Sequence, residues 1–499
     1  MIGDPTEAAL VVLAQKVGIV KERADTDHPR IFEIPFTSER KKMTTVNKTR
    51  AGLQVFSKGA CEVILEQCDT VLQDGMKIPL DGEVHARILE ANETMASAGL
   101  RVLAFSWKEL EDDKIPSDTL ESGLTFLGMV GMIDPPRTEV VEAVSQCKDA
   151  GIKVVMITGD HMLTAMAVGR EIGVVNRHDR VMSGVDLEKI TAADLAEYVE
   201  DIRVYSRVSP EDKIKIVNAF KNRGHIVAMT GDGINDAPAL KTADIGIAMG
   251  ITGTEVTKQS ASMVLADDNF ATIVSAIQEG RKIFENIRKY LVFLLPSNIS
   301  EVFILAFSII AGWPLPLLAK HILFLNLVTD GAPAIALGLE PEERGIMKKK
   351  PRDPRKGVFS GTKKWMVGVP ILLSVVTVAL FWLLLETNGW ESDESVSKAR
   401  TMVFGLMVFF ELFFSLSCRS LQNVVVNRRI LGNRLLTYSL IAETVAILVI
   451  MSYAPAQEVF GLAALDVTEW AIMLGLATSG FVYSELVKIL SQALENKRN

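Results

Sequence analysis

The sequence predicts a soluble α/β region followed by an all-α bundle of six transmembrane helices. Up to about residue 285, short apolar runs typical of strands alternate with patterns of helical period. From residue 291 onward long apolar stretches take over, and most approach the ~20 residues needed to cross a bilayer. A chain of 499 residues is also too long for one hydrophobic core. We therefore expect several domains.

The chain divides into three predicted domains. Residues 1–128 mix short strands with helices, which indicates an α+β fold. Residues 129–285 alternate strand and helix regularly, which predicts a parallel, doubly wound sheet with its ligands at the carboxyl ends of the strands. Residues 286–499 form the predicted membrane domain.

The elements are expected at the following positions. Strands of the first segment are predicted at 31–36, 53–57 and 100–106, and a helix at 6–15. Strands of the second segment are predicted at 126–133, 153–158, 204–207, 226–230 and 245–249. Helices between them are predicted at 138–150, 163–172, 211–221 and 237–243. The membrane spans are predicted at 291–312, 316–338, 365–385, 401–417, 435–455 and 469–490.

The charges of the loops predict how the chain crosses the bilayer. The loops 340–364 and 419–434 are rich in Lys and Arg, whereas 386–397 is acidic. The positive-inside rule puts both basic loops in the cytoplasm with the α/β region. We expect a multi-pass protein of the cell membrane, in contact with the lipid bilayer. The net charge of -8 argues against nucleic acid as a partner.

The strongest signal in the soluble region is the string MTGDGINDAPAL at residues 229–240. Asp232 and Asp236 follow a predicted buried strand, and Gly231 and Gly233 let the backbone bend and approach a ligand. Paired carboxylates with open positions suit Mg²⁺, which also binds phosphate oxygens. An Asx-rich turn that caps a helix would explain an isolated GDG, but it is a poor explanation for all twelve residues.

Two further strand ends carry residues suited to phosphate. Thr158, Gly159 and Asp160 form a TGD string, although Asp160 could simply cap the next helix. The string SRVSPEDK at 206–213 contains Arg207 and puts Lys213 one turn into a helix, whose N-terminus favours anions. An exposed helix lysine would be unremarkable alone, but three such strand ends together indicate a phosphate site.

Together these strings resemble a known family. The strings DPPR (134–137), TGD, SPEDK and TGDGINDAPAL occur in the order found in the phosphorylation domain of P-type ATPases, a domain of the haloacid-dehalogenase-like superfamily. The strings GDPTEAAL, PFTSERKKM and FSKGA are similar to part of that family's nucleotide domain. The resemblance covers essentially the whole chain. It implies a dehalogenase-like, Rossmann-type phosphorylation domain that uses ATP and Mg²⁺.

The resemblance also implies roles for individual residues. Asp232 would bind Mg²⁺ with support from Asp236, Lys213 would neutralise the γ-phosphate, and Asn235 would face the phosphate. Thr158, Gly159 and Asp160 would hold phosphate and ribose. Phe36 would stack on adenine, and Arg101 would reach the nucleotide phosphates. The other residues implied for the ATP site are Glu7, Lys41, Lys58 and Arg207.

Two strings typical of the family, DKTGT and TGES, do not occur in this sequence. They carry the phosphorylated aspartate and the actuator element, so the resemblance implies a C-terminal portion of a pump that begins inside the nucleotide domain. The missing N-terminal part is an expected partner. A non-catalytic or complementing pump fragment stays open, as does a membrane-anchored phosphatase of the dehalogenase class. Such a phosphatase would need the same aspartate but no acids inside the spans.

Acidic and amide residues inside the predicted spans indicate an ion path, because burying them in lipid is costly. Asn298 and Glu301 lie three residues apart in the first span. The second span contains Asn326, Thr329 and Asp330, followed by Gly331 and Pro333, which should break the helix. The fourth span contains Glu411. Interhelical hydrogen bonding would explain the amides or Thr329 alone, but it is a poor explanation for three carboxylates.

This all-oxygen set favours Ca²⁺ over softer metals. The string NLVTDG resembles the calcium sites of sarcoplasmic-reticulum-type pumps, which implies Ca²⁺ as the transported ion. Mn²⁺ and Na⁺ stay open as alternatives. Glu443 and Glu485, in the fifth and sixth spans, are weaker ligand candidates, and interhelical hydrogen-bonding or interface roles are predicted for both instead.

Overall fold

The computed structural model describes residues 5–37, 39–110, 119–133, 135–160, 162–176, 178–390, 392–425 and 432–496. The chain forms two compact units, which are described separately. One unit comprises the residues up to 148 together with 152–272, and the other comprises 149–151 and 273–499. Parts of the predicted motifs and loops lie outside the described residues: Gly3 and Asp4 of GDPTEAAL, Ser38 of PFTSERKKM, Asp134 of DPPR, Glu391 of the acidic loop, and residues 426–431 of the second basic loop, which include Arg428 and Arg429.

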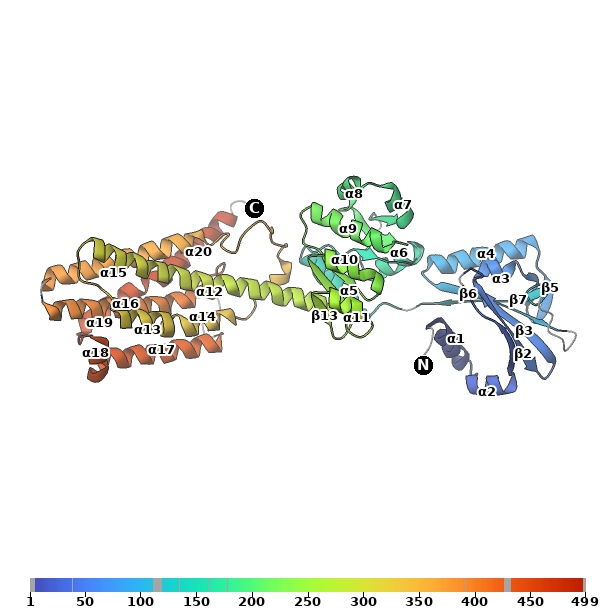
Figure 1. The fold of residues 1–499 in the computed structure, drawn as a ribbon, viewed down its shortest axis with the longest axis horizontal. Helices are drawn as coiled ribbons and strands as arrows, with labels where there is room; N and C mark the ends of the chain where they lie inside the picture. The colour runs from blue at the N-terminus through green and yellow to red at the C-terminus, as the bar shows by residue number, and fades with distance from the viewer. Residues whose placement is uncertain are drawn as a thin grey trace. The chain divides into compact units, whose positions relative to one another are not determined.

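The first region is built on one seven-stranded sheet (Figure 1). Its strands are β1 (Arg30–Ile34), β2 (Lys42–Thr49), β3 (Gly52–Gly59), β4 (Cys68–Gln73), β5 (Met76–Pro79), β6 (Arg101–Glu109) and β7 (Leu124–Met132). The order is β1-β2-β3-β6-β7-β4-β5. The helices are α1 (Pro5–Lys16), α2 (Lys21–Asp27), α3 (Cys61–Leu65) and α4 (Gly82–Ser97). Alternate residues of β3 are buried, among them Leu53 and Val55, so one face of the sheet packs on the core under α3 and α4.

One predicted strand belongs to a different sheet from the one expected. The strand expected at 126–133 exists as β7, but it pairs with β6 and β4 of the seven-stranded sheet. The predicted boundary between residues 128 and 129 therefore falls within β7. The sequence period could not reveal this, because a buried strand reads the same whichever neighbours it pairs with.

The second region of the soluble unit contains two three-stranded parallel sheets. One has the order β8-β10-β9 and the other β11-β12-β13. The strands are β8 (Met156–Ile157), β9 (Arg180–Ser183), β10 (Ile202–Ser206), β11 (Ala228–Gly231), β12 (Ile245–Met249) and β13 (Met263–Leu265). The main helices are α5 (Thr138–Asp149), α6 (Met162–Glu171), α7 (Gly184–Lys189), α8 (Ala192–Tyr198), α9 (Pro210–Asn222), α10 (Ala237–Thr242) and α11 (Glu255–Ser260).

The parallel pairing and the helices between strands agree with the prediction, but a single continuous hydrogen-bonded sheet does not form in the described residues. β8 is shorter than predicted, and its ladder pairs it only with β10. The two sheets nevertheless share apolar packing, since Ile157 of β8 packs with Val217 and Met229. The strands β9 and β13 were not predicted.

The second unit contains six helical segments long and apolar enough to cross a membrane. Their helices are α12 (Phe270–Ile310), α13 (Ala319–Phe324), α14 (Gly331–Gly338), α15 (Lys363–Asn388), α16 (Asp393–Cys418), α17 (Arg434–Ser452), α19 (Val467–Ala477) and α20 (Ser479–Asn496). The short helix α18 (Ala454–Phe460) follows α17. The helices α15, α16 and α20 run side by side (Figure 1). The six predicted spans are thus confirmed.

Three of the spans differ in detail from the prediction. α12 begins about 20 residues before the predicted span and has 41 residues. The second span is interrupted between α13 and α14 by the π-helix η2 (Leu325–Thr329), as the helix-breaking Gly331 and Pro333 led us to expect. The fourth span was predicted to be the shortest, but α16 is 26 residues long and is the most deeply buried span. The first turns of α16, from Asp393 on, are polar, so the apolar run in the sequence is shorter than the helix.

Buried ion pairs join the middle of α12 and the end of α16 to the first basic loop. Arg419 donates to Glu340 at 2.8 Å, and Asn433 donates to the same carboxylate at 2.7 Å. Lys289 lies 3.8 Å from Glu343, and both side chains are almost fully buried. Because losing one partner of a buried pair leaves an uncompensated charge, these contacts fix the register of the helix ends.

Glu200 ties three segments of the soluble unit together. Its carboxylate accepts from Lys153, which precedes β8, and contacts His225, which follows α9. Burial alone would raise the pKa of Glu200, but the hydrogen bonds and charges of Lys153 and His225 outweigh it and lower the pKa from 4.5 to about 2. A depressed pKa of this kind stabilises the fold above pH 4.5, and the contribution is lost as the pH falls towards 2.

We predict that Glu200→Gln lowers the free energy of unfolding by about 1 kcal/mol at pH 7, a value reduced for solvent screening of this half-exposed group. The difference from the wild type should shrink as the pH falls from about 4.5 towards 2. Denaturant unfolding of the chain in detergent, measured at several pH values, tests this. Glu197→Gln, at an exposed position of α8, is the control and should change little. A deficit in Glu200→Gln that is the same at every pH would contradict the electrostatic explanation.

Candidate phosphate and cation sites

Lys213 and Asp236 form the centre of the candidate phosphate site. The capping box of Ser209 and Asp212 starts α9, so Lys213 lies in its first turn. The Lys213 ammonium donates to Asp236 Oδ1 at 2.5 Å, and the backbone N–H of Gly233 donates to Asp236 Oδ2 at 3.2 Å. Asp236 is 7% exposed. Two residues that the sequence analysis singled out separately are thus in direct contact, and the contact places the Lys213 ammonium beside the turn that follows β11.

Gly231 makes this arrangement possible. A Cβ atom at position 231 would lie 2.4 Å from Cβ of Asp236 and 2.8 Å from its Oδ2. Such distances are too short for any side chain at position 231, so the close approach of the Asp236 side chain to this backbone requires glycine.

Asp232 and Asn235 are exposed at the same turn. The backbone carbonyl of Asp232 accepts from the Thr254 N–H at 3.0 Å and from Thr257 Oγ1 at 3.2 Å. These bonds fix the backbone, and no described residue donates a hydrogen bond to the Asp232 carboxylate. The side chain can therefore offer oxygens to a hard cation such as Mg²⁺. Thr254 and Thr257 were missed by the sequence analysis, because isolated threonines carry no motif.

The TGD string is attached to the end of β10. The Thr158 N–H donates to the Tyr205 carbonyl at 2.9 Å, and the Arg207 N–H donates to the Asp160 carbonyl at 3.2 Å. Thr158 Oγ1 donates to Asp160 Oδ2 at 3.0 Å and accepts from the Asp160 N–H at 3.0 Å. Arg207 has φ = 50°, a left-handed conformation that is strained for a non-glycine residue. The structure thus brings Thr158, Asp160 and Arg207 together, but no direct contact joins them to Asp232 among the described residues.

The candidate nucleotide residues lie at one end of the seven-stranded sheet. Residue pairs Lys42–Gly59 and Gly59–Ala104 align the start of β2, the end of β3 and the start of β6. This register groups Phe36, just after β1, with Lys41, Lys58 and Arg101 at the same end. Phe36 is 59% exposed, which leaves its ring available for stacking.

Helix α1 supplies partners to two of these cations. Lys58 donates to Glu7 at 2.7 Å and 2.5 Å, and Arg101 donates to Thr6 at 3.1 Å. Lys41 has φ = 52° and its carbonyl accepts from the Ala60 N–H at 3.0 Å, so the chain turns sharply before β2. An exposed aromatic ring next to three cations at a sheet end can bind a flat, anionic ligand.

Within the membrane bundle two asparagines hold two carboxylates. Asn298 of α12 donates to Asp330 Oδ2 at 2.9 Å, and Asn326 of η2 donates to Glu301 Oε2 at 3.0 Å. Each pair links α12 to the interrupted second span. Glu301 is 5% and Asp330 4% exposed. The four sequence-predicted residues therefore lie together, at the level where the π-helix interrupts regular helical hydrogen bonding.

The other predicted oxygens of this region lack donors. Thr329 Oγ1, Asp330 Oδ1 and both carboxylate oxygens of Glu411 are buried without a hydrogen-bond partner in the described residues. Helix α16, which carries Glu411, packs against η2, which contains Thr329 and directly precedes Asp330. Buried polar atoms are normally hydrogen-bonded, so these oxygens have free lone pairs that a bound cation could coordinate.

Glu443 of α17 shares these properties, contrary to the prediction that it is an interhelical hydrogen-bonding residue. It is 4% exposed, and neither carboxylate oxygen has a described partner. The same prediction is confirmed for Glu485, which accepts from Ser417, Lys488 and the Val425 N–H. An acid alone in an apolar helix was the available signal, but sequence spacing cannot tell whether a donor lies opposite it.

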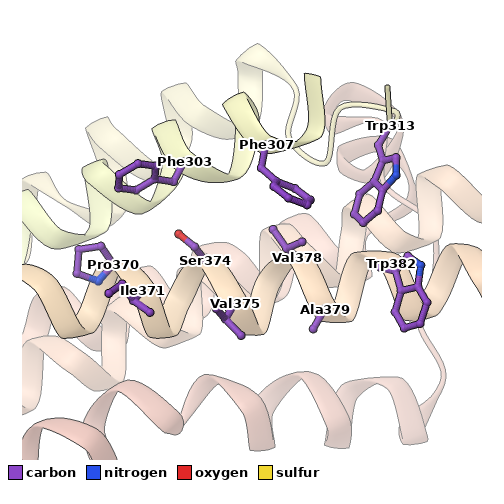
Figure 2. Close-up of a pocket in the computed structure, with 10 residues that line it drawn as sticks. All are labelled: Phe303, Phe307, Trp313, Pro370, Ile371, Ser374, Val375, Val378, Ala379 and Trp382. Carbon is purple, nitrogen blue, oxygen red and sulfur yellow. The ribbon is translucent and has the colours of Figure 1, made fainter. Parts of the chain in front are cut away.

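Two further observations concern where a cation could bind in the bundle. No three His, Cys, Asp or Glu side chains in the described parts of the chain converge closely enough to form a metal centre. An apolar cavity of about 680 Å³ lies between α12 and α15 (Figure 2). Phe307, Trp313 and Trp382 contribute to its wall, and no charged side chain lines it. It is therefore unsuited to a cation.

Comparison with known proteins agrees with this combination of sites. Residues 1–139 match the family profile for the P-type ATPase cytoplasmic domain N, and residues 314–490 match that for the cation-transporting ATPase C-terminus. The chain belongs to the P-type cation-transporting ATPases, and it is a multi-pass membrane protein with a mixed α/β soluble region.

Several relatives are named calcium-transporting ATPases. The chain is 40% identical to calcium-transporting ATPase 1 of Bacillus cereus over 498 residues, which is 98% of this chain and 56% of the relative. It is 41% identical to the calcium-transporting ATPase of Bacillus subtilis, with 95% and 53% of the two chains covered. It is 38% identical to mouse calcium-transporting ATPase type 2C member 2, with 100% and 52% covered. The chain thus spans about half the length of these relatives.

We predict that Gly231→Ala lowers the free energy of unfolding by about 1–3 kcal/mol, because the added methyl group forces Asp236 away from Lys213. The matched control is Gly159→Ala, where an added Cβ would meet no heavy atom within 4 Å. It should change stability by no more than about 0.5 kcal/mol. Denaturant unfolding of the chain in detergent compares the two. Equal effects of the two substitutions would show that the contact between positions 231 and 236 does not matter.

Proposed function

We propose that this chain supplies the nucleotide-binding, phosphate-binding and ion-binding regions of an ATP-driven calcium pump. The proposal rests on one observation: a single chain contains two sites of different chemistry. The Lys213–Asp236 pair suits phosphate and Mg²⁺, and buried carboxylates that lack donors suit a transported cation. The names of the relatives support calcium as that cation.

Each of the three predicted segments would carry one of these functions. Residues 1–128 are part of a nucleotide-binding domain, residues 129–285 are a dehalogenase-like, Rossmann-type phosphorylation domain, and residues 286–499 are the membrane domain. The parallel pairing of β8 with β10 and of β11 with β12 supports the second assignment.

In the phosphorylation domain the side chains act mainly by positioning charge. Asp232, with Asp236 behind it, would hold Mg²⁺, which supplies charge neutralisation at the phosphate oxygens. Lys213 would offer its ammonium to the transferred phosphoryl group, with Asn235 facing it. Thr158, Gly159, Asp160 and Arg207 would contact phosphate and ribose from the end of β10. Phosphoryl transfer depends on such positioning more than on covalent chemistry by the protein.

ATP would bind at the end of the seven-stranded sheet. Phe36 would stack on the adenine ring, and Lys41, Lys58 and Arg101 would surround the phosphates. Glu7 holds Lys58 in place through an ion pair. A nucleotide would have to compete with Glu7 for this ammonium.

The calcium site would be built from Asn298, Glu301, Asn326, Thr329, Asp330 and Glu411. These are hard oxygen donors, which Ca²⁺ binds in sets of six to eight. The interruption of the second span at η2 supports the assignment, because unwound backbone in a membrane is tolerated where it lines a cavity or a site. Mn²⁺ accepts the same ligands and is the competitor to test alongside.

We predict that the chain binds Mg·ATP and that Phe36→Ala weakens binding about tenfold, because base–aromatic stacking contributes about 1–3 kcal/mol. Isothermal titration calorimetry of the chain in detergent measures the affinity. Phe32→Ala, which removes a partly exposed ring from β1, is the control and should leave it unchanged. Equal losses in the two variants would move the adenine site away from Phe36.

We also predict that Asp330→Asn weakens calcium binding at least tenfold while leaving ATP affinity unchanged, because it removes one charge from a buried oxygen site. Equilibrium dialysis of the chain in lipid nanodiscs against radioactive calcium measures this. Asp353→Asn, in an exposed loop, is the matched control and should bind calcium like the wild type. Wild-type calcium affinity in Asp330→Asn would mean that the ion path runs elsewhere.

A further inference from the structure

Glu121 lies in the turn that precedes β7 and binds three side chains near the candidate adenine site. Its carboxylate accepts a hydrogen bond from Arg40 and one from Thr44 Oγ1 at 2.7 Å, and it forms an ion pair with Lys42 at 2.8 Å. The side chain is only 21% exposed. One half-buried carboxylate therefore joins the turn before β7 to the chain at the start of β2.

The partners of this carboxylate flank the residues assigned to the nucleotide. Arg40 also donates to the carbonyl of Pro35 at 3.1 Å, directly before Phe36. Lys42 directly follows Lys41 and is the first residue of β2. The carboxylate therefore fixes both ends of the turn between β1 and β2, which carries the aromatic ring and the ammonium assigned to ATP.

The turn that contains Glu121 is itself anchored. Leu120 is fully buried in the core of the seven-stranded sheet. Lys108 of β6 donates to the carbonyl of Thr119 at 2.5 Å and to that of Ser122 at 2.6 Å. Because this backbone is held on both sides, the carboxylate has a defined position from which to hold its partners.

Glu121 lies on the side of the sheet opposite the cation assigned to the nucleotide. Its partner Thr44 pairs with Ser57, which belongs to the buried set of β3 residues that faces α3 and α4. Lys58, the next residue of β3, points to the other face and binds Glu7 of α1 there. Glu121 therefore holds the turn from behind, without contacting a nucleotide.

The partners also keep the carboxylate charged. Burial alone would raise the pKa of Glu121, but the hydrogen bonds of Lys42, Thr44 and Arg40 and the charge of Lys42 outweigh it and lower the pKa below its usual value of 4.5. The carboxylate is therefore ionised at neutral pH, and its contacts persist there.

We propose that Glu121 is a positioning residue for ATP: through Arg40 and Lys42 it holds the turn that presents the adenine-stacking ring and the neighbouring ammonium. The inference rests on the proposed function, which assigns Phe36 and Lys41 to ATP, and it adds a residue that does not contact the ligand. A turn that is already ordered loses less conformational entropy when ATP binds, so the affinity is higher than that of a mobile turn.

The test measures Mg·ATP binding by the whole chain in detergent with isothermal titration calorimetry. Glu121→Gln keeps the size of the side chain but removes its charge, so the contacts with Arg40 and Lys42 weaken. We expect the affinity to fall at least about fivefold. Glu33→Gln, which breaks an ion pair with Arg30 within β1 of the same sheet, is the matched control and should bind ATP like the wild type.

The direction of the change separates positioning from electrostatics. ATP is an anion, and Glu121→Gln removes a negative charge and leaves the nearby cations Arg40 and Lys42 without it. Electrostatics alone would therefore make ATP bind more tightly, whereas loss of positioning makes it bind more weakly. An affinity of Glu121→Gln equal to or above that of the wild type would overturn the proposal.

A double variant provides a readout that a general loss of stability would not give. If Glu121 acts by placing the ring of Phe36, most of its contribution disappears once the ring is gone. Glu121→Gln combined with Phe36→Ala should then bind ATP within about twofold of Phe36→Ala alone. Losses that multiply fully in the double variant would show that Glu121 acts independently of the ring.

Arg40→Lys keeps the proposal testable if Glu121→Gln does not fold. The substitution retains the positive charge but replaces the fork of two nitrogens that binds Glu121 and the Pro35 carbonyl. ATP binding should again weaken, and wild-type affinity in Arg40→Lys would count against the proposal.

The two proposals fail in distinguishable ways. If Phe36→Ala binds ATP like the wild type, the adenine site of the proposed function is misplaced, and the role of Glu121 fails with it. If Phe36→Ala weakens binding while Glu121→Gln and Arg40→Lys do not, Glu121 is no positioning residue and the proposed function stands.

Discussion

The structure of the membrane bundle depends on one constraint, the cost of placing an ionised carboxylate where no donor can reach it. At the helix ends the chain meets this constraint with its own cations, as Arg419 does for Glu340. In the middle of the bundle it uses asparagine amides for one oxygen each of Glu301 and Asp330. Among the described residues, neither a cationic side chain nor an amide donates to the carboxylate of Glu411. A cation that binds at Glu411 would therefore gain the most electrostatic free energy, because no described group already compensates this carboxylate.

In the soluble unit, by contrast, the charged groups of the candidate site are already paired or reach solvent. Several of its candidate site residues, such as Asp232 and Asn235, are exposed side chains, and the backbone of Asp232 is held by hydrogen bonds from Thr254 and Thr257. Lys213 and Asp236 already neutralise each other. An arriving phosphate with Mg²⁺ could exchange these partners without creating an uncompensated charge. Along the chain the two regions are joined by the 41 residues of α12, which begins next to the second region of the soluble unit and later carries Asn298 and Glu301.

Much of this could be predicted from the sequence, because the informative signals are local. Strand ends followed by TGD or GDGIND, and amides three or four residues from acids in apolar helices, need no knowledge of tertiary structure. What could not be predicted depends on contacts far apart in the chain. β7 joined the first sheet through β4 and β6. Glu485 accepts hydrogen bonds from Lys488 and Ser417, whereas no residue in the described ranges donates to Glu443, an equally isolated acid in the sequence. Pairing of this kind is a property of the packed bundle, so spacing does not encode it.

The central claim is that the transported cation binds between α12, η2 and α16. The most direct measurement is a cryo-electron microscopy map of this chain in lipid nanodiscs, determined in calcium and again in a calcium chelator. The account predicts density for an ion within coordination distance of Asp330 and Glu411 in calcium, and its loss in the chelator. Saturating calcium that leaves these carboxylates without ion density, or an ion bound elsewhere in the bundle, would contradict it.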